Sequence, residues 1–185
     1  ILRHIRDHIR YLEQEQQLLD QCIVEAMSQY KEQWEILQTI PGVDKISAAV
    51  IIAEIGVDMK RFGRMDRLAS WAGMCPGNNE SAGKKKSGRT RKGNGALRQA
   101  LCEISNAAIR TKTQFQGKYK GLVIRRGHKR SIIAIGHKIL RIIYTLLEKK
   151  EPYHDPTVNY EALMVQRNAP RWICALKKFG YLNKA

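Results

Sequence analysis

The first part of the chain carries apolar side chains at alternating steps of three and four residues. These positions are Ile5, Ile9, Leu12, Leu19, Ile23, Ala26, Tyr30 and Leu37. This spacing draws one apolar stripe along a helix and is typical of a coiled-coil seam, in which Gln16 would help to set the register. At about 1.5 Å per residue, a helix over residues 2–37 would be roughly 50 Å long. We therefore predict a dimerisation or spacer helix over residues 1–37; the alternative is a helix packed along its own domain.

A short turn and a second helix follow. Pro41 lacks a backbone donor and Gly42 permits a turn, so the first helix must end there. Asp44 can cap the second helix, which Gly56 ends. The apolar residues at helical spacing between them are Ile46, Ala49, Val50 and Ala53. The pattern is typical of a helix-hairpin-helix, whose backbone N–H groups near Gly42 and Lys45 would hold a DNA phosphate. A plain pair of antiparallel helices would show similar spacing.

Helical spacing returns in the second half of the chain. A short helix is predicted over residues 64–72, and a longer one runs from a cap at Asn94 to about residue 110. A basic, partly amphipathic stretch over residues 115–126 leads to a long helix over residues 129–149. The side chains of this long helix that belong in the core are Ile132, Ile135, Ile139, Ile142 and Leu146.

Three prolines, Pro152, Pro156 and Pro170, are expected to break the C-terminal helical tail, residues 154–185, into short pieces. No run of alternating residues makes a convincing sheet. The predicted fold class is therefore mostly α: a long N-terminal coiled-coil helix, then a compact helical domain over residues 38–153. That domain would contain the helix-hairpin-helix and a basic Gly/Ser loop.

Positive charge dominates the composition. Lys and Arg number 33 against 17 Asp and Glu, which gives a formal net charge of +16. Such an excess attracts polyanions, of which phosphate backbones are the commonest. A membrane surface would instead favour a basic amphipathic helix, whereas the densest charge here lies in a Gly- and Ser-rich segment. Because the charge fits a ribosomal or chromatin role equally well, it indicates a nucleic-acid partner and no particular function.

Residues 76–95 are the most unusual segment, since their composition cannot build a core and predicts a loop or ribbon. Its cations are Lys84, Lys85, Lys86, Arg89, Arg91 and Lys92. Ser81 and Ser87 lie among them. A hydroxyl can attack a phosphodiester if cations neutralise the phosphate and a base takes the proton. The cations meet the first need, and no residue of the segment obviously meets the second. From the residues alone, the simpler interpretation is that both serines belong to a flexible loop.

Nothing in the sequence predicts a metal site. The carboxylates form no cluster suited to a two-metal nuclease. The cysteines Cys22, Cys75, Cys102 and Cys174 are far apart, which argues against structural zinc and favours reduced thiols. His137 falls within an apolar helix, so we interpret it as a partly buried histidine whose hydrogen bonds are satisfied.

An ordered series of motifs resembles a known family. The motifs are IPGV at 40–43, IIAEIG at 51–56, LASWAGMCP at 68–76, SAG at 81–83, GNGALRQAL at 93–101 and HKILRIIY at 137–144. Together they resemble the C-terminal domain of insertion-sequence transposases related to the Piv invertase, also described as bridge-RNA-guided recombinases. The resemblance covers residues 37–153, and the preceding helix is similar to the coiled coil of that family.

The resemblance implies a catalytic serine a few residues after the turn that ends at Pro76. Ser81 is the matching residue, which would attack DNA and form a covalent intermediate. In many relatives glycine follows that serine directly, whereas here Ala82 intervenes, so Ser87, followed by Gly88, remains the second choice. The six cations would bind phosphate of DNA or guide RNA, and Arg98 would support the loop from the next helix.

The family also implies components outside this chain. A RuvC-like N-terminal domain would bind Mg²⁺ through four acidic residues, and a guide RNA would direct strand exchange. Because Ile1 lies in a helical pattern without a cap, we expect an N-terminal portion to precede it, and we expect this chain alone to bind nucleic acid without cutting it. The implied protein is a prokaryotic, cytoplasmic homodimer or higher homo-oligomer that works at the nucleoid. The alternative is a non-catalytic helix-hairpin-helix binding module.

Overall fold

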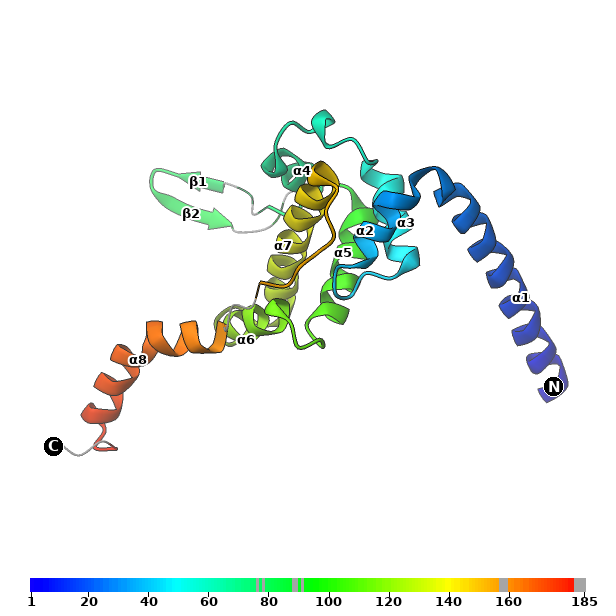
Figure 1. Cartoon of the computed structure of the whole chain (residues 1–185). Coiled ribbons are helices and arrows are strands. Elements are labelled where there is room, and N and C mark those ends of the chain that lie inside the picture. The colour runs from blue at the N-terminus through cyan, green and yellow to red at the C-terminus, as the bar shows by residue number, and fades with distance from the viewer. Residues whose placement is uncertain (76, 78, 88–89, 91, 157–159, 182–185) are drawn as a thin grey trace.

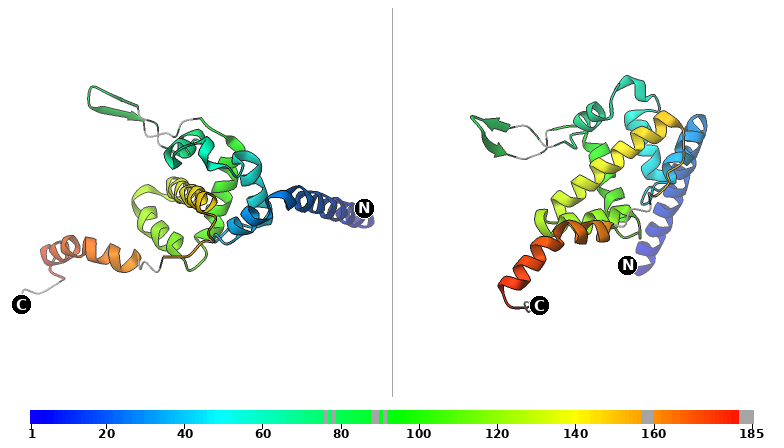
Figure 2. Two further views of the ribbon diagram at one scale, coloured as in Figure 1. Left: turned by 45° about the horizontal axis from the view of Figure 1, so that its top comes forward. Right: turned by 60° about the vertical axis from the view of Figure 1, so that its left-hand side comes forward.

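The computed structural model describes residues 1–75, 77, 79–87, 90, 92–156 and 160–181. Its helices are α1 (Leu2–Met27), α2 (Lys31–Gln38), α3 (Lys45–Ile55), α4 (Met65–Trp71), α5 (Gly95–Ala108), α6 (Gln114–Arg126), α7 (His128–Lys149) and α8 (Tyr160–Lys178). Two 3₁₀ turns, η1 (Ser28–Tyr30) and η2 (Met59–Arg61), and two strands, β1 (Asn79–Ser81) and β2 (Lys84–Ser87), complete the described elements. The mostly helical fold class is confirmed, and α2–α7 form a body from which α1, α8 and the β-hairpin project (Figures 1 and 2).

Helix α7 is the centre of the body and packs against α5, α6, α4 and α2. Its predicted core face is buried, except that Ile142 is only half-buried and lines a groove. Gly136 lets α7 pack closely against α5 and Met74. A Cβ at that position would lie 2.7 Å from Met74 Cε and 3.2 Å from Ser105 Oγ. A larger residue would therefore force α7 away from α5.

The predicted continuous helix over residues 2–37 is interrupted at η1. The interruption turns the chain so that Trp34, Ile36 and Leu37 of α2 enter the core. Trp34 Nε1 also donates a hydrogen bond to the Lys45 carbonyl, 2.9 Å away, which fastens α2 to α3. The part of the predicted coiled coil nearest the body is thus core structure.

Helix α1 leaves its apolar stripe uncovered. Ile5, Ile9, Leu12 and Leu19 are each 50–63% exposed. Figure 1 shows α1 running away from the body, so over most of its length it does not pack along its own domain. This arrangement is the one expected of a spacer or pairing helix.

The two predicted helix caps are confirmed. Asp44 Oδ1 accepts the Ser47 N–H at 2.8 Å. Hydrogen bonding with the Ser47 side chain, followed by that with the Ser47 backbone, lowers the pKa of the Asp44 carboxyl. Asn94 Oδ1 accepts the Leu97 N–H at 2.9 Å at the start of α5. The predicted apolar face of α3 was wrong in part, since Ile46 and Ala53 are exposed. Between α2 and α5, the buried face of α3 shares only Ala49 with the predicted one and is formed by Ala48, Ala49, Ile51, Ile52 and Ile55.

The expectation that Pro170 breaks the tail was wrong. Helix α8 passes through Pro170, because a helix that loses one N–H bond is still held by the bonds of its neighbouring turns. Exposed apolar side chains run along and beyond it, among them Leu163, Trp172, Ile173 and Leu176. Among the described residues, no helix is long and apolar enough to cross a membrane.

The β-hairpin joins the body through a narrow base, where two glycines meet. A Cβ at position 93 would lie 2.5 Å from Gly73 Cα and 2.6 Å from the Ala72 carbonyl carbon. The Asn94 N–H donates to the Trp71 carbonyl at 3.3 Å, and Asn94 Nδ2 donates to Glu54 Oε2 at 2.5 Å. These contacts tie the ends of the hairpin segment to α3 and α4.

We predict that Gly93→Ala destabilises the protein by about 2 kcal/mol, because the new Cβ would meet backbone that cannot rotate aside. Gly95→Ala is the matched control, since a Cβ there has no heavy atom within 4 Å and alanine favours the first turn of α5. Chemical unfolding of both variants measures the difference. Equal free energies of unfolding for the two variants would contradict the close contact at the base.

Candidate nucleic-acid interface

The basic segment forms an antiparallel hairpin whose tip carries Ser81. Ser81 pairs with Lys84, and Ala82 and Gly83 make the two-residue turn between them. Both turn residues have positive φ, +50° and +72°, as a type I′ hairpin turn requires. Alanine is strained in this conformation by about 1 kcal/mol, so Ala82 is an unusual residue at this position. The predicted loop or ribbon is therefore a ribbon over residues 79–87.

Ser87 occupies a different place on the same hairpin. It pairs with Asn79 at the end nearer the body, beyond an irregularity between Asn79 and Glu80. At about 3.3 Å per residue, the three steps along β2 from Lys84 to Ser87 span roughly 10 Å. Ser81 at the tip and Ser87 at the base therefore occupy separate places along the hairpin.

Three of the six predicted phosphate-binding cations belong to the returning strand of this hairpin. Lys84, Lys85 and Lys86 form most of β2, although their side chains lie outside the described part of the structure. Arg89 and Arg91 fall outside the described residues. Lys92 is exposed beside the hairpin base.

Arg98 lies in the first turns of α5 and is half-buried. Its charge acts on the thiol of Cys102, one turn along α5, and opposes the rise in the pKa of Cys102 that burial causes. Its expected support of the hairpin stays a prediction. Sequence reasoning did not find the link from Asn94 to Glu54, because the two residues are 40 positions apart.

Gly42 has a packing role in the turn between α2 and α3. Its φ is +89°, and a Cβ would lie 2.6 Å from the Ile104 carbonyl oxygen and 2.7 Å from Ala108 N. The turn therefore rests against α5 on that side. Lys45, the first residue of α3, has an exposed side chain. The helix, turn and helix are present, and phosphate contact by this turn stays a prediction.

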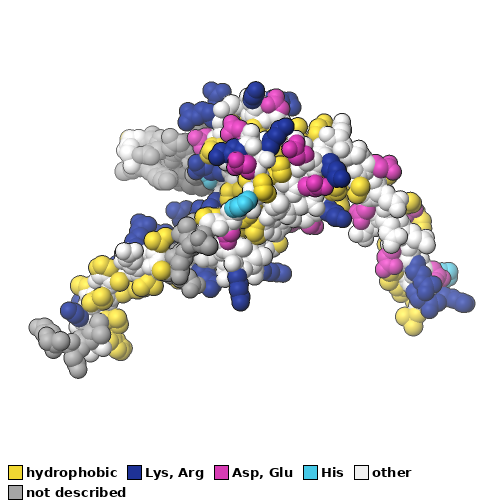
Figure 3. Space-filling view, in the orientation of Figure 1, with side chains coloured by type: hydrophobic (Ala, Val, Ile, Leu, Met, Phe, Trp, Pro, Cys, Tyr) yellow, Lys and Arg dark blue, Asp and Glu magenta, His cyan; other side chains and the backbone are white. Residues whose placement is uncertain are grey.

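A basic groove that sequence reasoning missed lies between α6, α7 and residues 151–156. Its volume is about 630 Å³, and its positively charged walls include Lys118, Lys138 and Arg141. Figure 3 shows Lys and Arg side chains on the body next to the hairpin and over α6. The basic character of residues 115–126 was the available signal, but only the packing of α6 on α7 brings these cations together.

His137 also lines this groove and is half-buried, as predicted. Burial is the largest cause that lowers the pKa of His137. The positive charges of Arg141 and Lys118 lower this pKa further, whereas the negative charge of Asp66 raises it. Within the described residues, no group of three or more His, Cys, Asp or Glu side chains is arranged to hold a metal ion. The four cysteines are free in the structure.

Comparison with known proteins finds one matching family and two relatives of this chain. Residues 34–120, which run from within α2 into α6 and include the hairpin, match the family described as Transposase IS116/IS110/IS902. The transposase for insertion sequence element IS1111A of Coxiella burnetii is 31% identical over 135 residues, which cover 70% of this chain and 37% of that protein.

A second relative is the insertion element IS900 uncharacterized 42 kDa protein of Mycobacterium paratuberculosis. It is 28% identical over 132 residues, or 69% of this chain and 33% of that protein. The chain thus spans about a third of the length of the relatives it matches. Residues 34–120 are thus similar to the transposases of the IS116/IS110/IS902 family.

Proposed function

We propose that this chain is the DNA-handling part of a transposase in which Ser81 attacks a DNA phosphodiester. The observation that carries the proposal is the transposase-domain match across the hairpin that bears this serine. The hairpin holds Ser81 at a projecting tip, where a phosphate can approach without entering the body (Figure 2). Paired with it is Lys84, the first of three consecutive lysines.

In the proposed step, Ser81 Oγ forms a bond to phosphorus while one bridging P–O bond of the DNA breaks. The serine proton leaves to a base, and the displaced DNA oxygen takes up a proton. Lys84–Lys86, Arg89, Arg91 and Lys92 would neutralise charge on the phosphate as it becomes five-coordinate. Because the bond energy is conserved in the phosphoserine linkage, the same step in reverse could join a new DNA strand.

Three further components belong to the proposal. A guide RNA would choose the DNA sites, and Mg²⁺ would be held by acidic residues outside this chain. The uncovered stripe of α1, containing Ile5, Ile9, Leu12 and Leu19, would pair with a second copy. Pairing through α1 would place two hairpins in one complex, as strand exchange between two DNA molecules requires.

The proposed phosphate contacts predict a change in salt dependence. The logarithm of the binding constant falls as the logarithm of the salt concentration rises. Replacing Lys84, Lys85 and Lys86 with alanine should make this negative slope shallower by roughly 2–3, since each lost phosphate contact removes about 0.7–0.9. Fluorescence anisotropy with a labelled DNA strand measures this slope.

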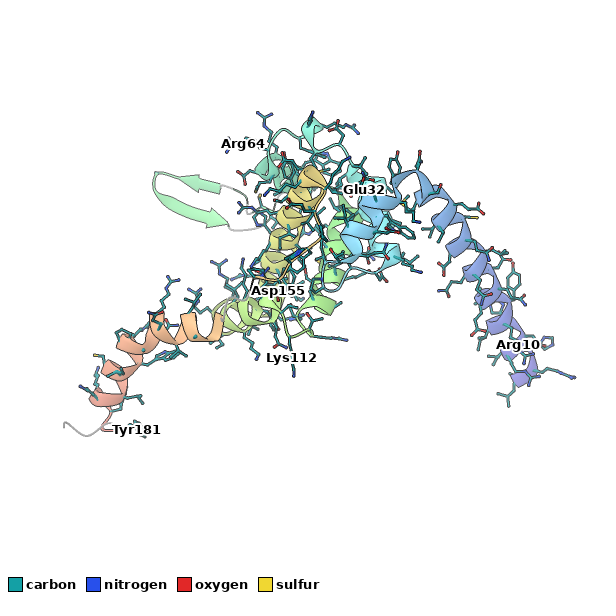
Figure 4. The ribbon with its side chains drawn as sticks, in the orientation of Figure 1. Arg10, Glu32, Arg64, Lys112, Asp155 and Tyr181 are labelled. Atoms are coloured by element: carbon teal, nitrogen blue, oxygen red, sulfur yellow. The ribbon has the colours of Figure 1, made fainter. Side chains whose placement is uncertain are left out.

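The matched control changes the net charge by the same amount on α1, which lies on the opposite side of the body from the hairpin (Figures 1 and 4). It replaces Arg3, Arg6 and Arg10, all exposed, with alanine. This variant should keep the wild-type slope. Equal losses in both triple variants would show that binding follows total charge and not the hairpin.

The proposed pairing of α1 predicts that Ile9→Asp with Leu12→Asp dissociates the oligomer. A charge at either position would be buried against the partner helix and would oppose association. Sedimentation velocity should show a shift to the monomer, while Arg10→Asp, an exposed neighbour, should leave the oligomer intact. A wild-type protein that sediments as a monomer would exclude pairing through α1.

The proposed nucleophile is tested with the full-length protein, Mg²⁺, a guide RNA and a suicide DNA substrate. A covalent protein–DNA adduct should form with wild type and with Ser87→Ala and be absent with Ser81→Ala. Denaturing gels detect the adduct, and unchanged DNA binding by Ser81→Ala excludes a folding defect.

Loss of the adduct only in Ser87→Ala would keep the reaction class and reassign the nucleophile to the hairpin base. If a confirmed RNA-guided complex forms no adduct in any variant, the chain is a nucleic-acid-binding module that does not itself attack DNA.

A further inference from the structure

The indole of Trp71 lies open at the surface of the body. Trp71 ends α4, and its side chain is 44% exposed, whereas its neighbours Leu68, Ala69 and Ala72 are buried. Trp34, in contrast, is only 9% exposed. A large aromatic side chain that stays partly open to water on a folded body is typical of a binding surface.

Phe62 holds this indole in place. The centroids of the two rings are 5.7 Å apart, and their planes are tilted by 57°. Phe62 follows the turn η2 and packs against the hydrophobic core, so the indole is supported by a side chain that the core itself holds. A ring that is already oriented loses little freedom when a ligand stacks on it, and this favours binding.

The segment that leads to Trp71 carries more positive than negative charge. Residues 58–71 contain four exposed cations and two exposed carboxylates, namely Lys60, Arg61, Arg64 and Arg67 against Asp58 and Asp66. Asp66 forms an exposed ion pair with Arg64 at 3.8 Å. Among the described residues, no ion pair joins Lys60, Arg61 or Arg67 to a carboxylate. Figure 4 places Arg64 at this outer edge of the body.

Arg67 is the cation most closely associated with the indole along the helix. It lies four residues before Trp71, the spacing at which side chains of one helix are neighbours. Its guanidinium also lies close to the turn at Gly63, where a Cβ would be 3.6 Å from Arg67 Nη1. A cation and an aromatic ring therefore share one exposed side of α4. Together they offer a phosphate contact next to a stacking surface, which neither residue provides alone.

The backbone of Trp71 is fixed at the base of the hairpin. Its carbonyl accepts the Asn94 N–H at 3.3 Å. A Cβ on Gly93 would lie 2.6 Å from the carbonyl carbon of Ala72, the next residue after Trp71. Figures 1 and 2 show α4 beside the point where the hairpin leaves the body. A strand that followed the hairpin to its base would therefore arrive at α4.

An open aromatic ring beside cations suits an unpaired nucleotide. The face of a base stacks on an aromatic side chain, and the neighbouring phosphates bind Lys or Arg. In a duplex the faces of the bases are covered by their neighbours, so only an unpaired base can offer its face. A protein surface would also cover the ring, but the excess of cations in residues 58–71 favours a polyanion.

We propose that Trp71 is a stacking platform for one unpaired base of a nucleic-acid strand, with Lys60, Arg61 and Arg67 binding the phosphates next to that base. The inference rests on the proposed function for the identity of the ligand as nucleic acid, but it does not depend on which residue is the nucleophile. In this arrangement the hairpin holds the strand by its phosphates, and Trp71 holds an unpaired base at the hairpin base.

Affinity for a fluorescein-labelled single-stranded oligonucleotide gives the first test. Trp71→Ala should weaken binding by about tenfold, which is within the range for loss of one base–aromatic stack. Trp71→Phe, which keeps a ring, should retain most of the affinity. Trp172→Ala is the matched control, because Trp172 is also 44% exposed but lies on α8, outside the α2–α7 body. Thermal unfolding by circular dichroism checks that each variant is folded.

An abasic strand separates stacking from charge. This probe has the same number of phosphates as the oligonucleotide but no bases, so the indole has nothing to stack on. Wild type and Trp71→Ala should bind it equally. If Trp71→Ala weakens binding of the abasic strand as much as that of the normal strand, the ring only maintains the charged surface and the stacking proposal is overturned.

Tryptophan fluorescence reports on the ring directly. In the Trp172→Phe chain, Trp71 is the exposed indole and Trp34 is buried. Saturating oligonucleotide should quench the emission of this chain, and the abasic strand should not. The chain with Trp71→Phe and Trp172→Phe, which keeps only Trp34, should show no quenching with either strand. Unchanged emission of Trp172→Phe at saturation would contradict stacking on Trp71.

Three outcomes separate this inference from the proposed function. If the Lys84–Lys86 variant weakens binding and Trp71→Ala does not, Trp71 is not a stacking platform and the proposed function stands. If Trp71→Ala leaves binding unchanged but alters sedimentation, the ring contacts another protein chain and the inference is again overturned. If the wild-type chain binds no oligonucleotide at all, both proposals fail.

Discussion

The close approach of the Gly73 and Gly93 backbones is the constraint on which the functional part of this structure depends. It brings the two ends of a highly basic segment together without side chains between them. Asn94 then secures the closed base, because its side chain caps α5 and also bonds Glu54 of α3. The two strands of the hairpin are therefore carried outside the core, and no charged side chain is buried among the described residues. The hairpin segment, whose composition cannot form a core, is thereby attached to the α2–α7 body at one defined place.

Helix α7 connects the two cationic surfaces. One of its faces packs on α5, where Gly136 allows close contact, and the adjoining side presents Lys138 and Arg141 to the groove. Burial and the charge of Asp66 raise the pKa of the Cys75 thiol, and the charge of Arg141 opposes them, so one cation of the groove acts on the residue that precedes the hairpin segment.

Local features of the fold could be predicted from sequence, and long-range ones could not. Asp44 and Asn94 were identifiable as caps because a cap is determined within four residues. The interruption at Ser28–Tyr30 was missed because the 3-4 repeat continues through it, and only the entry of α2 into the core requires the chain to turn. Lys118 and Arg141 are 23 positions apart, so their shared groove follows from packing and not from any motif. Ser81 was singled out through family resemblance, since the composition of its segment alone indicates only a loop or ribbon.

The most direct test of the central claim is to identify the residue that carries DNA in the covalent intermediate. The adduct formed by the full-length protein is digested with protease and nuclease, and the peptide with a nucleotide remnant is sequenced by mass spectrometry. The account predicts a phosphodiester link on Ser81, at the tip of the hairpin. A remnant on a residue outside residues 79–87 would contradict it, because the hairpin would then bind DNA without performing the chemistry.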